Sequence, residues 1–570
     1  MPGFGASEEV PSTAERHEMR STMQQAPLNI SQIVRYAASI HSSSETITWT
    51  GETSRRRTYG ELGARAARLA NGLRALGIQG DARVGTFMWN NNEHLEAYAA
   101  IPSMGAVLHT LNIRLFPEQL IYIANHAEDQ AVILDGSLIP LFAPQLPQMK
   151  TVKHIIVSGE GDRSLLGSHA AVHEYEELLA AQSEDFDFEA ASAGVDETDA
   201  AAICYTSGTT GNPKGVAYSH RSIYLHSMFV LTPMAFGISS NDKILAIVPM
   251  FHAMAWGLPY AALFSGADMH MPDRFLQPEP LCAFISREKP TVGGAVPTVW
   301  NAMLAYLDAQ DPKIRVDSLR DVAIGGSACP PALMQGIEER HGVKLLHAWG
   351  MTETSPLGSV ARPPAGLSKE ETMAYRLTQG LLPCPVEGRI VDDEGHALPH
   401  DGKAVGELEV RGPWITGSYI ENPNMPDPDA MKDKFRDGWL RTGDVAMISP
   451  DGFITLTDRA KDVIKSGGEW ISSVDLENAI MGHPKVAEAA VIGVPDPKWD
   501  ERPLAAVVPV AGSEVSFEEL REYLGDKVAK WQLPEHWALI PEVPKTSVGK
   551  FDKKVLRKQF ADNELEVTTF

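Results

Sequence analysis

Cysteine is scarce in this chain, and its spacing excludes two kinds of site. The 570 residues include four cysteines, and the closest two, Cys282 and Cys329, are 47 positions apart. No pair therefore has the two-residue spacing of a zinc or redox motif. So few thiols in so long a chain also argue against a disulfide framework, and reduced, buried thiols are expected.

Long apolar runs and an excess of positive charge are missing as well. No uninterrupted apolar stretch approaches the roughly 20 residues that span a bilayer, and the first thirty residues contain no apolar signal core. We therefore expect a cytoplasmic protein without an integral membrane segment. Lys and Arg number 50 against 74 Asp and Glu, for a formal net charge of −24. Such an acidic chain is not expected to use nucleic acid or an anionic membrane as its main partner.

The chain does have material for more than one hydrophobic core. Because 44% of its 570 residues are hydrophobic, and because one core rarely serves so long a chain, at least two domains are expected. A capping box at Thr58–Glu61 predicts the start of a helix. Helical and strand patterns then alternate, with a helix over Glu118–His126 and strands over Val84–Met88, Ala131–Asp135 and Val152–Val157. This alternation predicts α/β architecture with largely parallel sheets.

The pattern changes twice in the last third of the chain. From about Gly402 it predicts short strands separated by turns, and Asp458–Asp462 forms a charged break. A helix over Val474–Met481 and a strand over Val486–Val494 follow. The sequence thus predicts a mixed α/β (α+β) protein. Residues 1–457 would form a large N-terminal body of α/β subdomains plus a β-rich subdomain, and residues 458–570 a small mobile α+β domain, with a hinge near Asp458.

The strongest local signal is a loop that suits phosphate. Residues 205–215 read Tyr-Thr-Ser-Gly-Thr-Thr-Gly-Asn-Pro-Lys-Gly and follow an apolar strand over Ala200–Cys204. Glycines and small hydroxyl residues let backbone N–H groups and hydroxyls surround phosphate oxygens, and Lys214 adds a positive charge. The spacing differs from that of a Walker loop. A flexible surface loop is the plainer interpretation, but this composition directly after a buried strand favours phosphate binding.

Six further segments accompany this loop. They are Pro249–His252, Trp349–Glu353, Arg441–Asp444, the charged stretch with Asp458, Arg459 and Lys461, then Lys465–Trp470 and Pro544–Lys550. In content and order the seven segments resemble the motifs of the adenylate-forming superfamily, which includes acyl-CoA synthetases, peptide-synthetase adenylation domains and beetle luciferases. The resemblance covers nearly all of the chain after the first thirty residues. Soluble bacterial medium- and long-chain fatty acyl-CoA synthetases are the most similar subfamily.

The resemblance implies a two-step reaction. A fatty acid would be joined to the α-phosphate of ATP with release of pyrophosphate, and coenzyme A would then take the acyl group and release AMP. ATP, Mg²⁺ and coenzyme A are the implied cofactor and co-substrates. A homodimer is also implied. An apolar stripe at residues 28–37 could pack on a second subunit or on the body of its own chain.

The resemblance also assigns roles to individual residues. Lys550 would be catalytic in adenylation, and His252 would border the substrate carboxylate. Thr206 and Glu353 would bind Mg²⁺. Nucleotide contacts are assigned to Thr206, Ser207, Gly208, Thr209, Thr210, Gly211, Lys214, Gly326, His347, Ala348, Trp349, Gly350, Thr352, Asp444, Arg459, Lys461, Lys465 and Trp470. The coenzyme A tunnel would be lined by Gly467, Gly468 and Glu469, and the acyl pocket by Ala253, Trp256, Gly257 and Pro297.

Three alternatives remain open from the sequence. The acceptor could be a carrier-protein pantetheine arm instead of free coenzyme A, although no carrier domain follows in the 570 residues. The acid could be an aryl acid. The chain could also be a catalytically silent nucleotide-binding protein, against which the presence of Lys550, Glu353 and Asp444 speaks. Trp349 stands where many relatives have Tyr, so a contact that needs the phenolic hydroxyl is in doubt.

Overall fold

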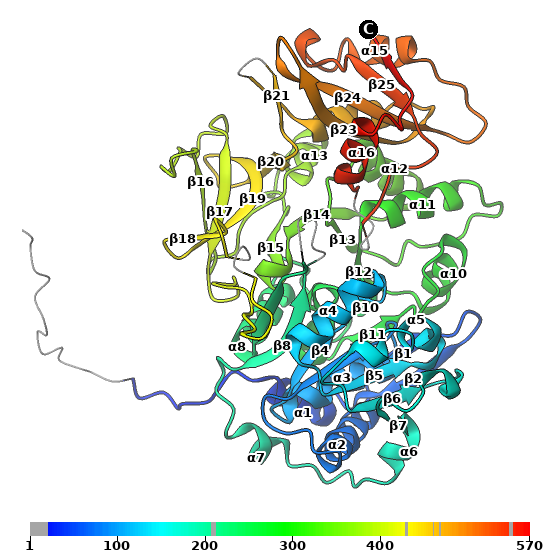
Figure 1. The fold of residues 1–570 in the computed structure, drawn as a ribbon, viewed down its shortest axis with the longest axis vertical. Helices are drawn as coiled ribbons and strands as arrows, with labels where there is room; N and C mark the ends of the chain where they lie inside the picture. The colour runs from blue at the N-terminus through cyan, green and yellow to red at the C-terminus, as the bar shows by residue number, and fades with distance from the viewer. Residues whose placement is uncertain (1–20, 207–211, 428–430, 460, 467–468, 547–550) are drawn as a thin grey trace, which may run out of the picture.

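The described part of the protein has a large body and a smaller C-terminal unit. The computed structural model describes residues 21–206, 212–427, 431–459, 461–466, 469–546 and 551–570. In Figure 1 the body fills the lower part of the view and the C-terminal unit, orange to red, lies above it. No helix among the described residues is long and apolar enough to cross a bilayer.

Two large sheets form the centre of the body. The first sheet has seven strands in the order β7 (Ala171–Glu174), β6 (His154–Ser158), β5 (Ala131–Asp135), β3 (Arg83–Phe87), β4 (Val107–Thr110), β8 (Ala200–Tyr205) and β9 (Gly215–Ser219). The second has eight strands in the order β15 (Leu357–Val360), β14 (Leu345–Gly350), β13 (Asp321–Gly325), β12 (Val292–Ala295), β10 (Lys243–Ala246), β11 (Asp268–Met271), β1 (Glu45–Trp49) and β2 (Ser54–Thr58). Within each sheet most neighbours are parallel, as the alternation of helices and strands predicted.

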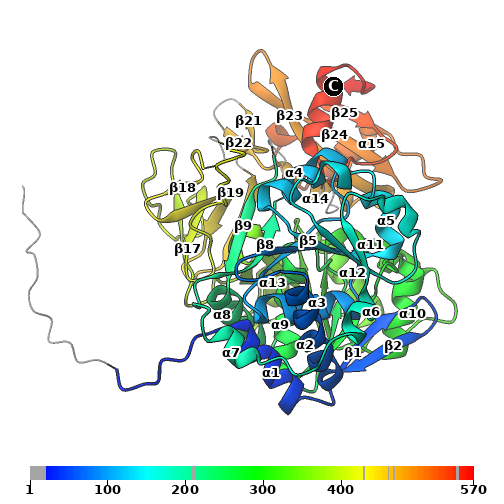
Figure 2. The same cartoon turned by 60° about the horizontal axis from the view of Figure 1, so that its bottom comes forward.

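Two smaller sheets complete the fold. The β-rich subdomain contains β16 (Glu387–Val391), β17 (Gly406–Arg411), β18 (Phe435–Arg436), β19 (Trp439–Ile448) and β20 (Ile454–Arg459). The C-terminal unit contains β21 (Ile464–Ser466), β22 (Glu469–Ile471), β23 (Val486–Asp496), β24 (Asp500–Pro509), β25 (His536–Leu539) and β26 (Val567–Thr569). The β-rich subdomain lies to one side of the body in both views, next to the C-terminal unit (Figures 1 and 2). The predicted fold class is therefore confirmed.

Several local predictions are also confirmed. Helix α2 (Tyr59–Ala75) begins with the predicted capping box, in which Thr58 Oγ1 accepts from Glu61 N at 3.1 Å. Helices α4 (Pro117–Ala127) and α14 (Ser473–Met481) lie where helical spacing predicted them. The prediction of a charged break over Asp458–Asp462 is wrong for its first two residues. Asp458 and Arg459 end strand β20, because they still pair with β19.

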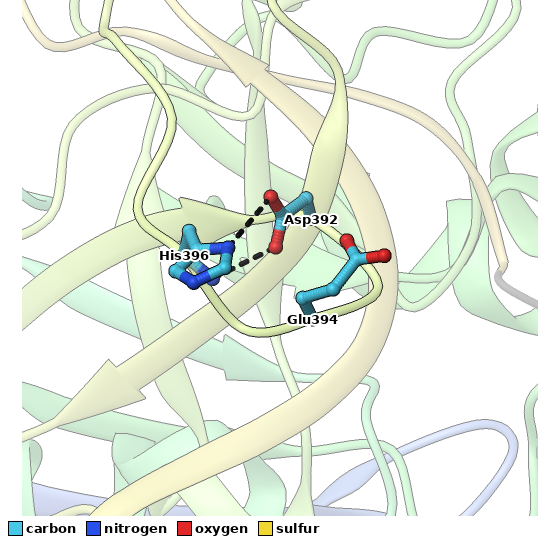
Figure 3. A group of neighbouring side chains, drawn as sticks. All are labelled: Asp392, Glu394 and His396. Atoms are coloured by element: carbon cyan, nitrogen blue, oxygen red, sulfur yellow. Dashed lines mark hydrogen bonds and ion pairs between the residues drawn. The ribbon is translucent and has the colours of Figure 1, made fainter.

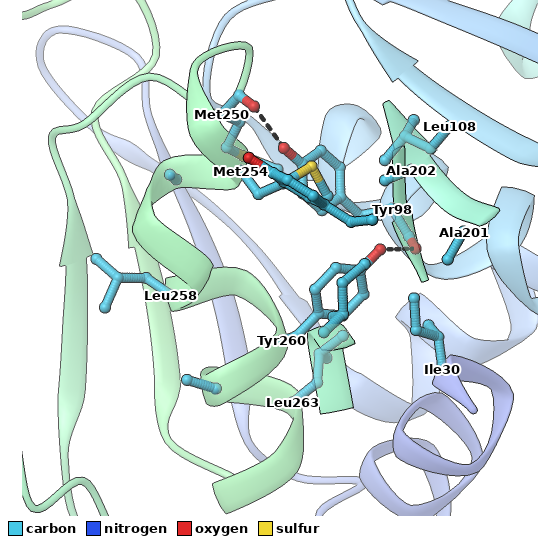
Figure 4. Packing of buried hydrophobic residues seen from close by; sticks show 14 of the residues in the cluster. Ile30, Tyr98, Leu108, Ala201, Ala202, Met250, Met254, Leu258, Tyr260 and Leu263 are labelled. Atoms are coloured by element: carbon cyan, nitrogen blue, oxygen red, sulfur yellow. Dashed lines mark hydrogen bonds between the residues drawn. The ribbon is translucent and has the colours of Figure 1, made fainter. Parts of the chain in front are cut away.

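The apolar stripe near the N-terminus packs on the chain's own body. In helix α1 (Ile30–Ile40) the side chains of Ile30, Ile33, Val34 and Ala37 are buried among body residues. Ile30 lies at the edge of the cluster in Figure 4, where Tyr260 donates its hydroxyl to the Tyr98 carbonyl at 3.0 Å. The stripe therefore gives no support to a dimer contact, and the homodimer stays a prediction.

Candidate active site

A cavity of about 760 Å³ lies where the body meets the C-terminal unit. Its wall includes Thr206, which follows β8, and Gly326, which follows β13. The β-rich subdomain contributes Asp444 of β19 to the wall, and the C-terminal unit contributes Glu477 of α14. Ligands of α/β proteins bind in this position, beyond the carboxyl ends of parallel strands. Four parts of the fold thus contribute to one site.

Asp444 is a buried carboxylate of this wall that two side chains hold in place. It is 2% exposed, and its Oδ2 accepts from Trp349 Nε1 at 2.8 Å. Its Oδ1 pairs with Arg459 Nε at 2.7 Å, since β19 and β20 place the two residues opposite each other. Both donors fix the orientation of the carboxylate, and each oxygen keeps a further lone pair for a ligand. The indole N–H of Trp349 is therefore a structural partner of Asp444, a contact that the sequence did not predict.

Trp349→Phe is expected to weaken binding of ATP, the nucleotide that the resemblance implies, more than it slows turnover. Phenylalanine keeps an aromatic ring but removes the N–H that orients Asp444, and a buried acceptor that loses its donor costs about 1–3 kcal/mol. We expect KM for ATP to rise about tenfold, measured by steady-state kinetics at saturating acid and coenzyme A. Trp300→Phe is the matched control, because Trp300 is fully buried in another core and its Nε1 has no hydrogen-bond partner among the described residues. An unchanged KM in Trp349→Phe, or an equal rise in the control, would contradict this role.

Glu353 supplies a second buried carboxylate. It lies in a 3₁₀ turn, η5 (Thr352–Thr354), is 5% exposed, and its Oε1 accepts from the Tyr419 hydroxyl at 2.5 Å. Burial and the nearby Glu353 charge raise the pKa of Tyr419, so its hydroxyl stays a donor. Oε2 of Glu353 has no hydrogen-bond donor among the described residues. One carboxylate oxygen is therefore available to a ligand.

These groups suit a hard cation. Thr206 Oγ1 accepts from Lys214 N at 3.1 Å and lies on the same cavity wall as Glu353. Lys214 Nζ lies 5.4 Å from the centre of the Tyr419 ring. Because Tyr419 donates to Glu353, this contact places Lys214 near the Glu353 carboxylate. Mg²⁺ prefers one or two protein oxygens together with phosphate oxygens and water. The donor set of Glu353 and Thr206 fits that preference.

A second group of possible metal ligands has a different explanation. Asp392, Glu394 and His396 lie close together in the hairpin between β16 and β17 (Figure 3). Asp392 accepts from His396 N at 2.8 Å and contacts His396 Nδ1 at 3.3 Å, which closes the hairpin turn. None of the three lines the cavity. We therefore interpret the group as a turn and not as a metal centre.

The apolar end of the cavity is built around Trp256. Ala253 to Trp256 all have positive φ values between 44° and 58°, a left-handed turn that L-residues rarely adopt. The turn places the indole over two strand glycines. A Cβ added at Gly294 of β12 would lie 3.2 Å from the six-membered ring, and one at Gly325 of β13 would lie 3.6 Å from it. Glycine at 294 therefore leaves room for the indole, whereas glycine at 325 leaves room mainly for the Ala348 carbonyl oxygen, which would lie 2.6 Å from a Cβ there.

Gly257 stands behind this wall. It has φ 77° and is not among the cavity-lining residues, because its α-carbon faces the ring of His226. A Cβ there would lie 2.5 Å from His226 Cε1. Burial lowers the pKa of His226 to about 3, and its neutral Nε2 accepts from Leu357 N at 3.1 Å. The sequence placed Gly257 in the acyl pocket, whereas the structure places it in the supporting layer.

The structure brings most of the predicted site residues to the cavity. The residues that line it are Thr206, Lys214, His252, Ala253, Trp256, Pro297, Gly326, His347, Ala348, Trp349, Gly350, Thr352, Glu353, Asp444, Arg459 and Lys461. Lys465 does not line it, and its backbone N–H donates to Glu501 at 2.9 Å. Ser207, Gly208, Thr209, Thr210, Gly211, Gly467, Gly468 and Lys550 lie outside the described residues, as do the side chains of Glu469 and Trp470.

The polar residues in the wall that the sequence missed include three with clear contacts. Tyr419 holds Glu353, Lys434 approaches from the β18–β19 hairpin, and Arg114 stacks on the Phe251 ring with 5.8 Å from Cζ to the ring centre. All three lie between recognisable motifs, so no local pattern marked them. Only their shared cavity shows that they belong to the site.

Comparisons with known proteins agree with this geometry. Residues 35–420 match the family model described as AMP-binding enzyme, and residues 475–550 match the AMP-binding enzyme C-terminal domain. The chain therefore belongs to the family of AMP-binding, adenylate-forming enzymes. Among its members it is an acyl-CoA ligase of the AMP-forming kind, an enzyme that uses ATP, Mg²⁺ and coenzyme A.

Individual relatives cover almost the whole chain. A 3-methylmercaptopropionyl-CoA ligase of Ruegeria lacuscaerulensis is 44% identical over 548 residues, which are 95% of this chain and 99% of that protein. A long-chain-fatty-acid–CoA ligase of Thermus thermophilus is 44% identical over 547 residues, covering 95% and 97%. The crystal structure of the anthranilate CoA ligase AuaEII with anthranoyl-AMP matches with a TM-score of 0.84 at 25% identity, covering 95% and 99%.

Proposed function

We propose that this enzyme activates unbranched aliphatic acids, with medium- and long-chain fatty acids as its main class. The observation that carries the proposal is the apolar end of the cavity, where Trp256 lies over Gly294 and Gly325 and where Ala253 and Pro297 also line the wall. We propose that this apolar end is a slot that suits a thin chain better than a ring. The relatives named for a long-chain fatty acid and for a short thioether acid both support an unbranched chain.

In the first step the carboxylate oxygen attacks the α-phosphorus of ATP, and pyrophosphate leaves. Asp444, held by Trp349 and Arg459, would bind the ribose hydroxyls and fix the nucleotide. Glu353 and Thr206 would hold Mg²⁺, which when bound neutralises phosphate charge. Lys214 faces the same space, and His252 would border the carboxylate. Preorganised charges of this kind stabilise the transition state without reorganising during the reaction.

In the second step the thiol of coenzyme A attacks the acyl carbonyl, and AMP leaves. We propose that the domain boundary lies at residues 457/458 and that the C-terminal domain turns about Asp458 between the steps. Thr546 and Phe551, which flank the segment with Lys550, both line the cavity. Ser466, which precedes Gly467 and Gly468, does not. The described orientation therefore suits the first step, and a turn would bring Gly467, Gly468 and Glu469 to the site for the second.

We propose Arg114 as a phosphate contact at the edge of this site. It follows β4, which pairs in parallel with β8, so the loops after the two strands emerge at the same edge of the sheet. Burial lowers the pKa of Arg114, and among the described residues its guanidinium contacts the Phe251 ring and forms no ion pair. Arg114 is exposed, and a cation without a carboxylate partner suits an anionic ligand.

A panel of acids tests the proposed substrate class. Each methylene transferred into the slot contributes about 0.8 kcal/mol, so kcat/KM is expected to rise from butanoate to octanoate and to stay high for hexadecanoate. Benzoate and cinnamate are expected to be poor substrates. The measurement is ATP- and coenzyme A-dependent thioester formation. A preference for benzoate over octanoate would favour the aryl-acid alternative.

Trp256→Ala is expected to shift the preferred chain length towards longer acids while KM for ATP stays unchanged. Removing the indole opens the slot beside Gly294 and Gly325 without touching Asp444 or Glu353. If Trp256 served only as core packing, stability would fall by about 3–5 kcal/mol and all acids would lose activity in parallel. Trp256→Phe serves as the control, because it keeps most of the packing and should change the preference least.

A further inference from the structure

We propose that Lys434 is a second, fixed phosphate-binding cation of this site, which contacts the phosphate of the nucleotide in both half-reactions. The inference rests on the proposed two-step function and assigns a residue that no motif marks. Lys434 is half-buried and lines the cavity together with Glu353 and Asp444. Lys434 precedes Asp458 in the chain and belongs to the body, whereas Lys550 follows Asp458 in the sequence.

The position of Lys434 is fixed by a short hairpin. β18 pairs with β19 directly after it, and Arg441 N donates to the Lys434 carbonyl at 2.9 Å. The turn between the strands contains Asp437 and Gly438, with φ values of 50° and 77°. The backbone of Lys434 is therefore held on both sides of its side chain, and its ammonium lies in one region of the cavity wall.

That region lies beside the two carboxylates of the site. Lys434 Nζ donates to the Thr442 carbonyl at 3.3 Å, and the Thr442 hydroxyl accepts from Asp444 N at 3.0 Å. The next residue after Lys434, Phe435, packs against Tyr419 with 5.5 Å between ring centres, and Tyr419 holds Glu353. Lys434 thus connects to Asp444 on one side and to Glu353 on the other.

The Lys434 ammonium has N–H donors that are available to a ligand. Among the described residues it makes one long hydrogen bond, to the Thr442 carbonyl, and no ion pair. Burial lowers the pKa of Lys434, with the charge of Glu353 as the strongest opposing influence. A partly desolvated ammonium whose remaining N–H groups face a cavity is costly without an anion. An incoming phosphate oxygen would supply that anion and a charge-assisted hydrogen bond.

The expected ligand atom follows from the two neighbours. If Asp444 binds the ribose and Glu353 the metal that accompanies the phosphates, the phosphate next to the ribose lies between them. This phosphate remains in place as the α-phosphate of ATP, as the phosphate of the acyl-adenylate and in AMP. Because Lys434 does not move with the C-terminal domain, it would contact this group before and after the turn that removes Lys550.

Binding of AMP and adenosine tests this inference directly. Calorimetry on the full-length protein would compare wild type, Lys434→Met, Lys434→Arg and Lys432→Met. Lys434→Met removes the charge at similar length, and Lys432 is an exposed lysine of the same segment that does not line the cavity. We expect Kd for AMP to rise about 10- to 100-fold in Lys434→Met, the loss of one hydrogen bond to a charged group, with Kd for adenosine unchanged. Lys434→Arg should stay within a few-fold of wild type, and Lys432→Met should equal it.

Kinetics of the two half-reactions distinguish the role of Lys434 from that of Lys550. Lys434→Met is expected to raise KM for supplied acyl-AMP in thioester formation as well as to slow adenylation from ATP. Unchanged AMP binding, or a parallel loss of AMP and adenosine binding, would overturn the inference, as would an acyl-AMP half-reaction that Lys434→Met leaves unaffected. If AMP binding depends on Lys434 but no fatty acid is activated, the proposed substrate class fails while this inference stands.

Discussion

Lys550→Ala is expected to slow acyl-adenylate formation from ATP by about 10²–10³-fold, the usual cost of removing one preorganised charge donor. Thioester formation from supplied acyl-adenylate and coenzyme A should stay near the wild-type rate, because Lys550 would then have turned away with its domain. The measurement is pyrophosphate release for the first step and thioester formation without ATP for the second.

Two controls make this contrast diagnostic. Lys545→Ala removes a lysine that pairs with Glu488 at 2.6 Å in the same C-terminal segment, and it should change neither half-reaction by more than a few-fold. Gly468→Leu should have the reverse effect of Lys550→Ala, blocking the pantetheine path while adenylation stays near normal. A merely destabilised protein would lose both steps together. Parallel loss in both variants would therefore contradict the alternating-domain mechanism.

Glu353→Gln is the second change with a large expected effect. A neutral amide keeps the shape and can still accept from Tyr419, but it is a poor ligand for a hard cation. We expect adenylation to fall by at least about 10²-fold, with a higher Mg²⁺ requirement and an unchanged melting temperature. Pyrophosphate release across a Mg²⁺ titration measures this.

Tyr419→Phe is the matched control for Glu353. It removes the hydroxyl that orients the carboxylate but leaves the charge, so its loss should be smaller and should shrink as Mg²⁺ is raised. Wild-type pyrophosphate release by Glu353→Gln would remove Glu353 from the metal site. Equal losses in Glu353→Gln and Tyr419→Phe would instead indicate that the hydrogen bond matters more than the charge.

The sequence predicted the fold where a single segment carries its own signal. The capping box at Thr58 and the apolar spacing of α14 each define a helix from a few neighbouring residues. Strand pairing depends on distant residues and was less visible. Asp458 and Arg459 look like a charged break, yet β19 lies beside them and its pairing keeps both residues in strand β20.

The same distinction holds for the site. Trp349, Glu353 and Asp444 lie within motifs, so the sequence placed them at the nucleotide. The bond from Trp349 to Asp444 joins positions 95 residues apart, and no local pattern could show it. Lys434 and Tyr419 likewise reach the cavity only because the β-rich subdomain folds beside the main sheets. Gly257 has a sequence position typical of the pocket, but its positive φ and the ring of His226 place it behind the wall.

The most direct test of the two-step mechanism follows the carboxylate oxygens. Octanoate labelled with ¹⁸O at both oxygens would be incubated with ATP, Mg²⁺, coenzyme A and the full-length protein, and the products would be analysed by mass spectrometry. Attack on the α-phosphorus followed by thiol attack on the acyl carbonyl leaves one ¹⁸O in AMP, one in the thioester and none in pyrophosphate. That distribution is the predicted result. Label in inorganic phosphate with ADP as the nucleotide product, or AMP without label, would contradict an acyl-adenylate intermediate.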